Sequence, residues 1–343
     1  MARNKGKKLL LLAGIMSMVT AISVLITYGM NEPRKQWNKT DSNASYTRSE
    51  KQIETIVTSF YPMYIATLNL TEGVEGIKVE NLMNQQVGCP HDYQLTTGDM
   101  MKLEQADMLI INGGDMESYV EEVASAYNNL IIVDSSKNIS LLEGSEHSHN
   151  HEHEEEVHEH EEDVSHNEED AHDHEAYNGH IWMDPTRYVL QLENITRELI
   201  ANDSDNEDKY EENLKAYKQR IMKVWNQYEK LATTAKSPVI IFHDAMEYLM
   251  ASLGIEVAVC IDIDGETSLS AGEIAEVIEE VKEHNIKVLF IEAQFDTNIA
   301  ASIAKETGAK VYVLDTMVSG EIKKDAYINS LSSNLTVLDE VFN

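Results

Sequence analysis

Short β-branched and apolar runs alternate with segments of helical spacing along most of this 343-residue chain, and this alternation restricts the folds that it can adopt. Apolar runs bounded by helices are typical of parallel strands buried on both faces. The first block has predicted strands at 53–60, 76–82, 106–112 and 130–134, and helices at 61–71, 99–106 and 117–127. The second block has predicted strands at 238–242, 255–261, 287–291 and 310–314, and helices at 244–253, 271–283 and 298–307. The sequence therefore predicts two α/β lobes, each with a mainly parallel sheet flanked by helices.

The region between the blocks predicts helices only. Asp184-Pro185 begins one over 187–200, and after a polar break one long amphipathic helix covers 207–235. At about 1.5 Å per residue this helix would be roughly 40 Å long, enough to join two lobes, although one more surface helix is an open alternative. The predicted domains are an N-terminal anchor or signal with a polar tether (1–50), a first lobe (51–205), a linking helix (206–235) and a second lobe (236–343).

The N-terminus indicates export. A basic stretch, 1–8, precedes an uncharged, mostly apolar run, 9–28, which is long enough to span a bilayer as a helix. We expect an uncleaved anchor, with a cleaved signal as the alternative, and hence a protein at the cell surface or secreted. The two cysteines, Cys89 and Cys260, lie far downstream, which excludes a lipid anchor on an N-terminal cysteine. We interpret them as two separate thiols.

A histidine-rich acidic stretch interrupts the first lobe. It has almost no aliphatic residues, so we expect a disordered loop over 143–178 that handles metal rather than a bland charged linker. Its auxiliary weak ligands are His147, His149, His151, His153, His158, His160, His166, His172 and His174. The formal net charge of −33 fits cation binding and argues against nucleic acid or anionic lipid as partners.

Four further histidines remain as candidates for a defined site. In parallel sheets, ligands bind at the carboxyl ends of strands. His243 and Asp315 each follow a predicted strand directly, and His91 and His180 lie in turns of the first lobe, whereas His284 ends a charged helix and should be exposed. Three imidazoles and a carboxylate suit a tetrahedral Zn²⁺ site, with Asp92, Asp244 and Glu247 as candidates for orienting the ligands.

Several motifs together resemble the solute-binding component of zinc-uptake ABC transporters. They are GCPHDYQL (88–95), GHIWMDP (179–185), FHDAMEYL (242–249), GETSLS (265–270), EAQ (292–294) and GAKVYVLD (308–315). The resemblance implies two lobes joined by a rigid helix, with Zn²⁺ between them as the transported ligand. It assigns His91 and His180 to the first lobe's ligands and His243 and Asp315 to the second's, and it implies a monomer that serves an ABC permease and its ATPase. Histidine at position 243 and the His-rich insert resemble the zinc branch rather than the manganese branch.

Two other functions are compatible with these residues. A zinc hydrolase would use three histidines and an open position for water, but Asp315 would close that shell. A surface adhesin or metal store would have the same ligands and no permease. We predict a binding protein that is not an enzyme. Cys89, two residues from His91, is read as a buried thiol rather than a competing ligand.

Overall fold

A computed structural model describes residues 53–83, 90–144, 177–232, 237–261, 269–292 and 297–342. The predicted anchor and tether, the nine auxiliary histidines and Cys89 lie outside these ranges. Within the described residues, no helix has the length and apolar character needed to cross a membrane.

The first lobe contains a four-stranded parallel sheet in the order β2-β1-β3-β4. The strands are β1 (Thr55–Thr58), β2 (Lys78–Asn81), β3 (Met108–Ile111) and β4 (Ile131–Asp134). β3 is central and apolar, and all of its residues are buried, as expected for a strand covered on both faces. The sheet confirms the prediction of parallel strands, although each strand is shorter than its apolar run.

Helices of the first lobe begin where local chemistry favours a helix start. They are α2 (Tyr61–Leu70), α3 (Thr97–Glu104), α4 (Val120–Ala126) and α5 (Pro185–Asn202). At α3, the Thr96 hydroxyl and the Asp99 carboxylate cap each other's backbone N–H groups. At α5, the Asp184 carboxylate accepts from Thr186 N while Pro185 takes the first helical position. The start predicted at Asp184-Pro185 is confirmed.

The second lobe contains a parallel sheet in the order β10-β9-β7-β8. Its elements are β7 (Val239–Ile241), η4 (Asp244–Met246), α7 (Glu247–Ser252), β8 (Val257–Cys260), α8 (Ala271–Glu283), β9 (Val288–Glu292), α9 (Thr297–Thr307), β10 (Lys310–Leu314) and α10 (Ala326–Phe342). The helix expected over 244–253 divides into the 3-10 turn η4 and the short helix α7. The helix α10, which lies after the last strand, was not predicted from the sequence.

Alternation along the second sheet divides its side chains between two cores. Val239 and Ile241 of β7 belong to a cluster that also contains first-lobe residues, whereas Ile240 belongs to a second cluster under α8 and α9. In β9, Leu289 belongs to the second cluster and Phe290 belongs to the first. Successive side chains of a strand point to opposite faces, so one face of this sheet shares a continuous buried core with the first lobe.

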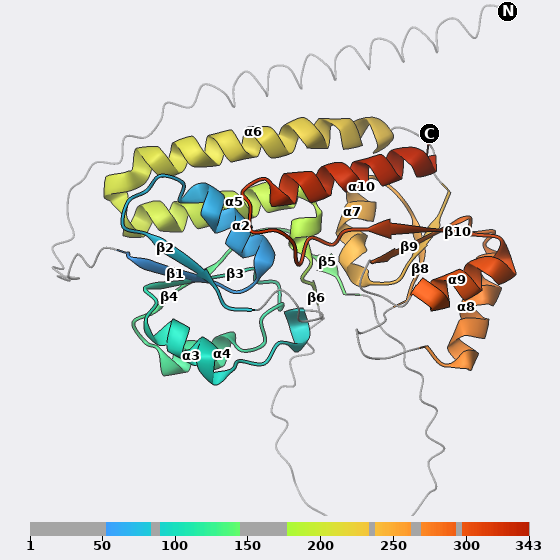
Figure 1. The fold of residues 1–343 in the computed structure, drawn as a ribbon, viewed down its shortest axis with the longest axis horizontal. Coiled ribbons are helices and arrows are strands. Elements are labelled where there is room, and N and C mark those ends of the chain that lie inside the picture. The colour runs from blue at the N-terminus through green and yellow to red at the C-terminus, as the bar shows by residue number, and fades with distance from the viewer. Residues whose placement is uncertain are drawn as a thin grey trace, which may run out of the picture. The chain divides into compact units, whose positions relative to one another are not determined.

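The long helix α6 (Glu207–Ala232) packs against helices of both lobes. It contacts α2 and α5 of the first lobe and α10 of the second, and the three helices α5, α6 and α10 lie close together in Figure 1. Its buried apolar side chains include Tyr210, Tyr217, Ile221 and Trp225, at helical spacing. The predicted fold, two parallel α/β sheets with one long helix, is confirmed. The domain boundaries at 205/206 and 235/236 stay a prediction.

The segment after β10 is fastened to the first lobe by hydrogen bonds. The indole Nε1 of Trp182 donates to Thr316 O at 2.8 Å, and the Tyr327 hydroxyl donates to Trp182 O at 2.7 Å. The Tyr61 hydroxyl donates to Glu321 O at 2.7 Å. Trp182 lies in η2 (Ile181–Met183), directly after His180. These bonds hold the turn next to His180 against the chain that follows β10.

Candidate metal centre

His180 lies between the two-residue strand β6 (Tyr177–Asn178) and η2, and its side chain is completely buried. β6 pairs with β5 (Leu142–Glu143) in a short antiparallel ladder. Burial, followed by like-charge repulsion with His243 and His91, lowers the pKa of His180 well below its usual value of 6.5. The imidazole is therefore neutral at physiological pH, which is the form that binds a metal ion.

The Asn178 side chain fixes the orientation of this ring. Its Nδ2 donates to Asp244 O at 3.0 Å and to Glu247 Oε2 at 2.9 Å, so its Oδ1 is the acceptor for His180. That oxygen lies 2.9 Å from His180 N and 3.0 Å from His180 Nδ1. Since Nδ1 carries the proton in this arrangement, the lone pair of His180 is on Nε2.

Backbone packing leaves no room beside Gly179, the residue before His180. The buried Asn112 amide donates from Nδ2 to Gly179 O at 2.8 Å. A Cβ at position 179 would lie 2.7 Å from Gly114 O, a backbone atom that cannot move out of the way as a flexible side chain can. The path of the chain into His180 is therefore set by contacts with the carboxyl end of β3.

His243 follows β7 and is held by the neighbouring strand. Its Nδ1 lies 2.8 Å from Oε1 of Glu292, the last residue of β9, which is almost completely buried. Its Nε2 lies 3.4 Å from Oδ1 of Asp244. A carboxylate on one ring nitrogen leaves the other nitrogen for an ion, as is common for histidines that bind zinc.

The structure brings together the three predicted histidines. The ring centroids of His91 and His180 are 5.0 Å apart, and those of His180 and His243 are also 5.0 Å apart. His91 lies in η1 (Pro90–Asp92) and is exposed, whereas the other two are buried. The three rings come from segments that are distant in sequence, as expected for a site assembled by folding.

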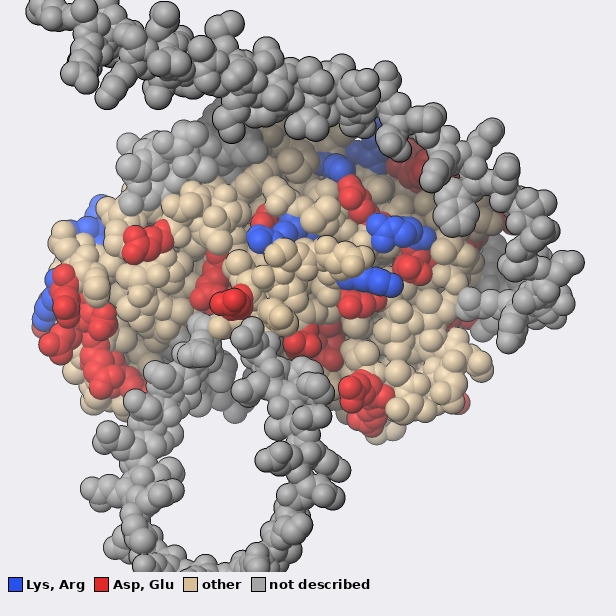
Figure 2. All heavy atoms as spheres, turned by 180° about the vertical axis from the view of Figure 1, so that it is seen from behind, with Lys and Arg blue, Asp and Glu red and all other residues tan. Residues whose placement is uncertain are grey.

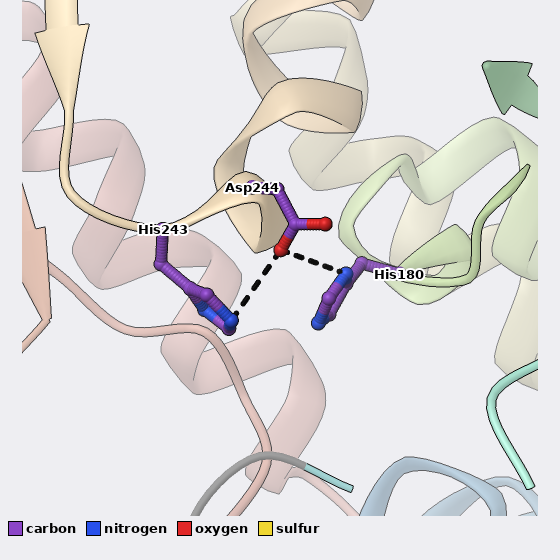
Figure 3. A group of neighbouring side chains, drawn as sticks. All are labelled: His180, His243 and Asp244. Carbon is purple, nitrogen blue, oxygen red and sulfur yellow. Dashed lines mark ion pairs between the residues drawn. The ribbon is translucent and has the colours of Figure 1, made fainter. Parts of the chain in front are cut away.

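The carboxylate beside these rings is Asp244, which Figure 3 shows between His180 and His243. Candidate ligand atoms of His180, His243 and Asp244 all lie within 4.8 Å of one another, and no other such group is found within the described residues. Asp315 directly follows β10, is exposed, and accepts a hydrogen bond from Met317 N at its Oδ1. Its predicted role as a ligand stays a prediction.

Two residues that contact the histidine rings, Glu292 and Asn178, were not among the predicted orienting residues. Glu292 ends a buried strand, so the strand-end argument that selected His243 would also have selected it. The sequence around Asn178 has no feature that would identify it as a residue that orients a ligand. Glu247, a predicted orienting residue, accepts a hydrogen bond from Asn178 at its Oε2, and its role in orienting a histidine stays a prediction. The side chain of Asp92 lies outside the described residues, and His284 is exposed beside Glu280, as expected.

Comparison with known proteins decides the family. The model of the zinc-uptake complex component A, periplasmic, matches residues 56–341. The chain belongs to this zinc-uptake family. The high-affinity zinc uptake system protein ZnuA of Bacillus subtilis (strain 168) is 31% identical over 293 residues, which are 83% of this chain and 86% of that protein.

Two further relatives support membership in the zinc-uptake family. The zinc-binding lipoprotein AdcA of Streptococcus pneumoniae (strain ATCC BAA-255 / R6) is 26% identical over 83% of this chain, which spans about half of that protein (55%). The structure of the metal-dependent lipoprotein YcdH of Bacillus subtilis superposes with a TM-score of 0.67 at 26% identity, covering 84% of this chain and 98% of that one. The predicted resemblance is confirmed: this member of the zinc-uptake family is a solute-binding component of an ABC uptake system and not an enzyme.

Proposed function

We propose that this protein captures Zn²⁺ outside the cytoplasmic membrane and delivers it to the permease of an ABC importer, which its ATPase drives. The observation that carries the proposal is the convergence of His91, His180 and His243, with the His180 ring buried and neutral. Nitrogen-rich sites completed by one carboxylate suit Zn²⁺, which prefers four ligands in a tetrahedral arrangement. We propose that the protein acts as a monomer.

The ligand set comprises the three imidazoles and one carboxylate from the second lobe. We propose Asp315 for that carboxylate, as the resemblance to the family implies; it follows β10 near the segment fastened to the first lobe. Support from both lobes makes the site sensitive to their relative position, because His180 belongs to the first lobe and His243 to the second. Release to the permease would then follow from separating the two groups of ligands.

The acidic surface and the His-rich stretch would raise the local concentration of cations around this site. Acidic side chains are spread over the face shown in Figure 2, and the whole chain has a formal net charge of −33. Histidines 147–174 would act as weak, exchangeable ligands that collect zinc or sense its abundance. Residues 9–28 would anchor the protein to the membrane, so that capture takes place close to the permease.

Zinc titration of the full chain tests whether the tight site and the weak ligands of the His-rich stretch are separate. The tight site should be lost in His243→Ala and kept after deletion of residues 146–175, whereas the deletion should remove several weak sites. Loss of the tight site in the deletion variant would refute the proposed division. Retention of the tight site in His243→Ala would refute the proposed metal centre itself.

A further inference from the structure

Tyr248, in α7 of the second lobe, is completely buried and makes its hydrogen bonds to the first lobe. Its hydroxyl accepts a hydrogen bond from Leu142 N at 3.0 Å and donates one to Asn178 O at 2.8 Å. Leu142 and Asn178 are paired in the two-residue ladder of β5 and β6. Since a hydroxyl has only one proton to donate, that proton is committed to Asn178. The hydroxyl of Tyr248 therefore bridges the two strands of this hairpin.

The hairpin needs such support because it is very short. Isolated two-stranded hairpins are only marginally stable, and β5 and β6 have two residues each. The guanidinium of Arg187 lies over the ring of Tyr248, with 5.1 Å between Arg187 Cζ and the ring centroid. Arg187 Nε also donates to Ser140 O, just before β5, at 3.0 Å. Tyr248 and Arg187 together fix the position of the hairpin.

Asn178 connects the hairpin to the metal centre. Its backbone oxygen is held by Tyr248, and its Oδ1 accepts from N and Nδ1 of His180 at 2.9 and 3.0 Å. Asn178 is almost completely buried, and α7 also contacts η2, the turn that follows His180. We propose that Tyr248 is a positioning residue of the metal centre, which sets the place of the His180 ring through Asn178. This inference rests on the proposed function, since it concerns the same site.

The hydroxyl can be removed without removing the ring. Tyr248→Phe keeps the aromatic ring under Arg187 and leaves Leu142 N and Asn178 O without this hydrogen-bond partner. Sheltered backbone groups without a partner are unfavourable, so we expect the two strands to shift until these groups find new partners. His180 is two residues from Asn178 and bonded to its side chain, so the shift should reach the imidazole.

The test measures Tyr248→Phe in the full chain, with no more than one equivalent of metal so that the tight site fills first. Chelator competition with Zn²⁺ should show an affinity about 10-fold lower, as expected for a residue that orients a ligand. The visible spectrum of bound Co²⁺, which depends on coordination geometry, should change. Thermal unfolding without metal checks that the variant folds.

Tyr210→Phe is the matched control. Tyr210 of α6 is also completely buried, and its hydroxyl donates to Asp203 Oδ2 at 2.6 Å, in a contact that involves neither the hairpin nor a histidine. We expect Tyr210→Phe to lower the unfolding temperature and to leave both the zinc affinity and the Co²⁺ spectrum unchanged. A stability effect alone would therefore be visible in both variants, and a positioning effect only in Tyr248→Phe.

Three results would overturn the inference. They are an unchanged zinc affinity in Tyr248→Phe, an equal loss of affinity in Tyr210→Phe, and a loss in Tyr248→Phe with an unchanged Co²⁺ spectrum, which would show that the His180 ring had kept its place. His180→Ala separates this inference from the proposed function. If His180→Ala abolishes tight binding while Tyr248→Phe does not weaken it, only the role of Tyr248 fails. If His180→Ala binds zinc tightly, the proposed metal centre fails as well.

Discussion

Glu292 Oε1 lies 2.8 Å from Nδ1 of His243; Glu292 ends β9 and His243 follows the neighbouring parallel strand β7, at the same edge of the second sheet. Glu292 is only 1% exposed. A buried carboxylate in this position accepts a hydrogen bond from the Nδ1–H group, stabilises positive charge on a metal-bound ring, and prevents the ring from turning. Nε2 of His243 is thereby directed toward Asp244 and His180.

Glu292→Leu should therefore weaken zinc binding although residue 292 does not touch the ion. Loss of a supporting carboxylate typically costs about 10–100-fold in metal affinity, and we expect Glu292→Gln, which keeps a hydrogen-bond acceptor, to lie at the low end. Chelator competition measures both variants. The matched control is Glu280→Gln, since Glu280 also pairs with a histidine, His284, but on the surface of α8. Equal affinities for Glu292→Leu and Glu280→Gln would contradict the role of Glu292.

Asn178→Asp should also lower zinc affinity by about 10–100-fold, because the amide contacts the His180 ring through its oxygen and the Asp244 segment through its nitrogen. The new oxygen would face Asp244 O and Glu247 Oε2, where Asn178 now donates two hydrogen bonds. Repulsion there should move the ring of His180 relative to His243. Isothermal titration of the metal-free protein measures the change.

Asn194→Asp is the matched control for Asn178→Asp. Asn194 is also buried, and its Nδ2 donates to Ser135 O and Lys137 O, away from the histidines. We expect Asn194→Asp to lower the free energy of unfolding and to leave the zinc affinity of the folded protein unchanged. A loss of affinity of the same size in both variants would show that Asn178 acts only through general stability.

Glu117 predicts a pH dependence of stability. It lies at the carboxyl end of β3, where it accepts from Asn112 N at 2.7 Å and Gly113 N at 3.0 Å. Burial raises the pKa of Glu117 from 4.5 to about 7, against the lowering effect of these hydrogen bonds. Since the folded state binds this proton more tightly than the unfolded state, the contribution to stability is complete below pH 4.5 and is lost as the pH rises through 7.

Denaturant unfolding of the metal-free protein between pH 5 and pH 8 checks this sign. Glu117→Gln cannot ionise, so the free energy of unfolding should fall less steeply with pH in this variant than in the unmodified protein. Glu104→Gln at the end of α3 is the control, because Glu104 is an exposed carboxylate of the same lobe whose charge is not among the causes of the raised pKa of Glu117. An identical slope in the unmodified protein and Glu117→Gln would contradict the raised pKa.

Much of the fold could be predicted from local pattern alone. The apolar runs at 106–112 and 287–291 became the central strands β3 and β9, because a strand covered on both faces needs apolar residues at every position. The helix α10 was missed although Tyr327, Leu331 and Leu338 have helical spacing. Its apolar face is interrupted by the buried Asn334, whose purpose becomes visible only when its side chain is seen to bind the backbone of Asp315.

The candidate site shows where sequence reasoning ends. His91, His180 and His243 could be found because turns and strand ends carry ligands and because the motifs resemble a known family. Asp244 was predicted as a candidate for orienting the ligands, and its place beside His243 depends on the turn at η4, which local pattern did not predict. The role of Asn178 depends on contacts with Asp244 and Glu247, which are more than sixty residues away.

Gly179→Ala should weaken zinc binding by displacing the backbone of His180. The added Cβ would lie 2.7 Å from Gly114 O and 2.9 Å from the Met116 side chain, closer than such contacts normally are, and Gly179 O is already held by Asn112. Overpacking of this kind typically costs about 1–3 kcal/mol of stability. Gly272→Ala, in the first turn of α8, is the matched control, because its Cβ would meet only Ser270 Oγ at 3.7 Å, so we expect no overpacking and a small gain in stability from the lower backbone entropy of the unfolded chain. Thermal unfolding and zinc titration of both variants should therefore differ in direction, and a Gly179→Ala protein with unchanged stability and affinity would show that the path into His180 is less constrained than these contacts indicate.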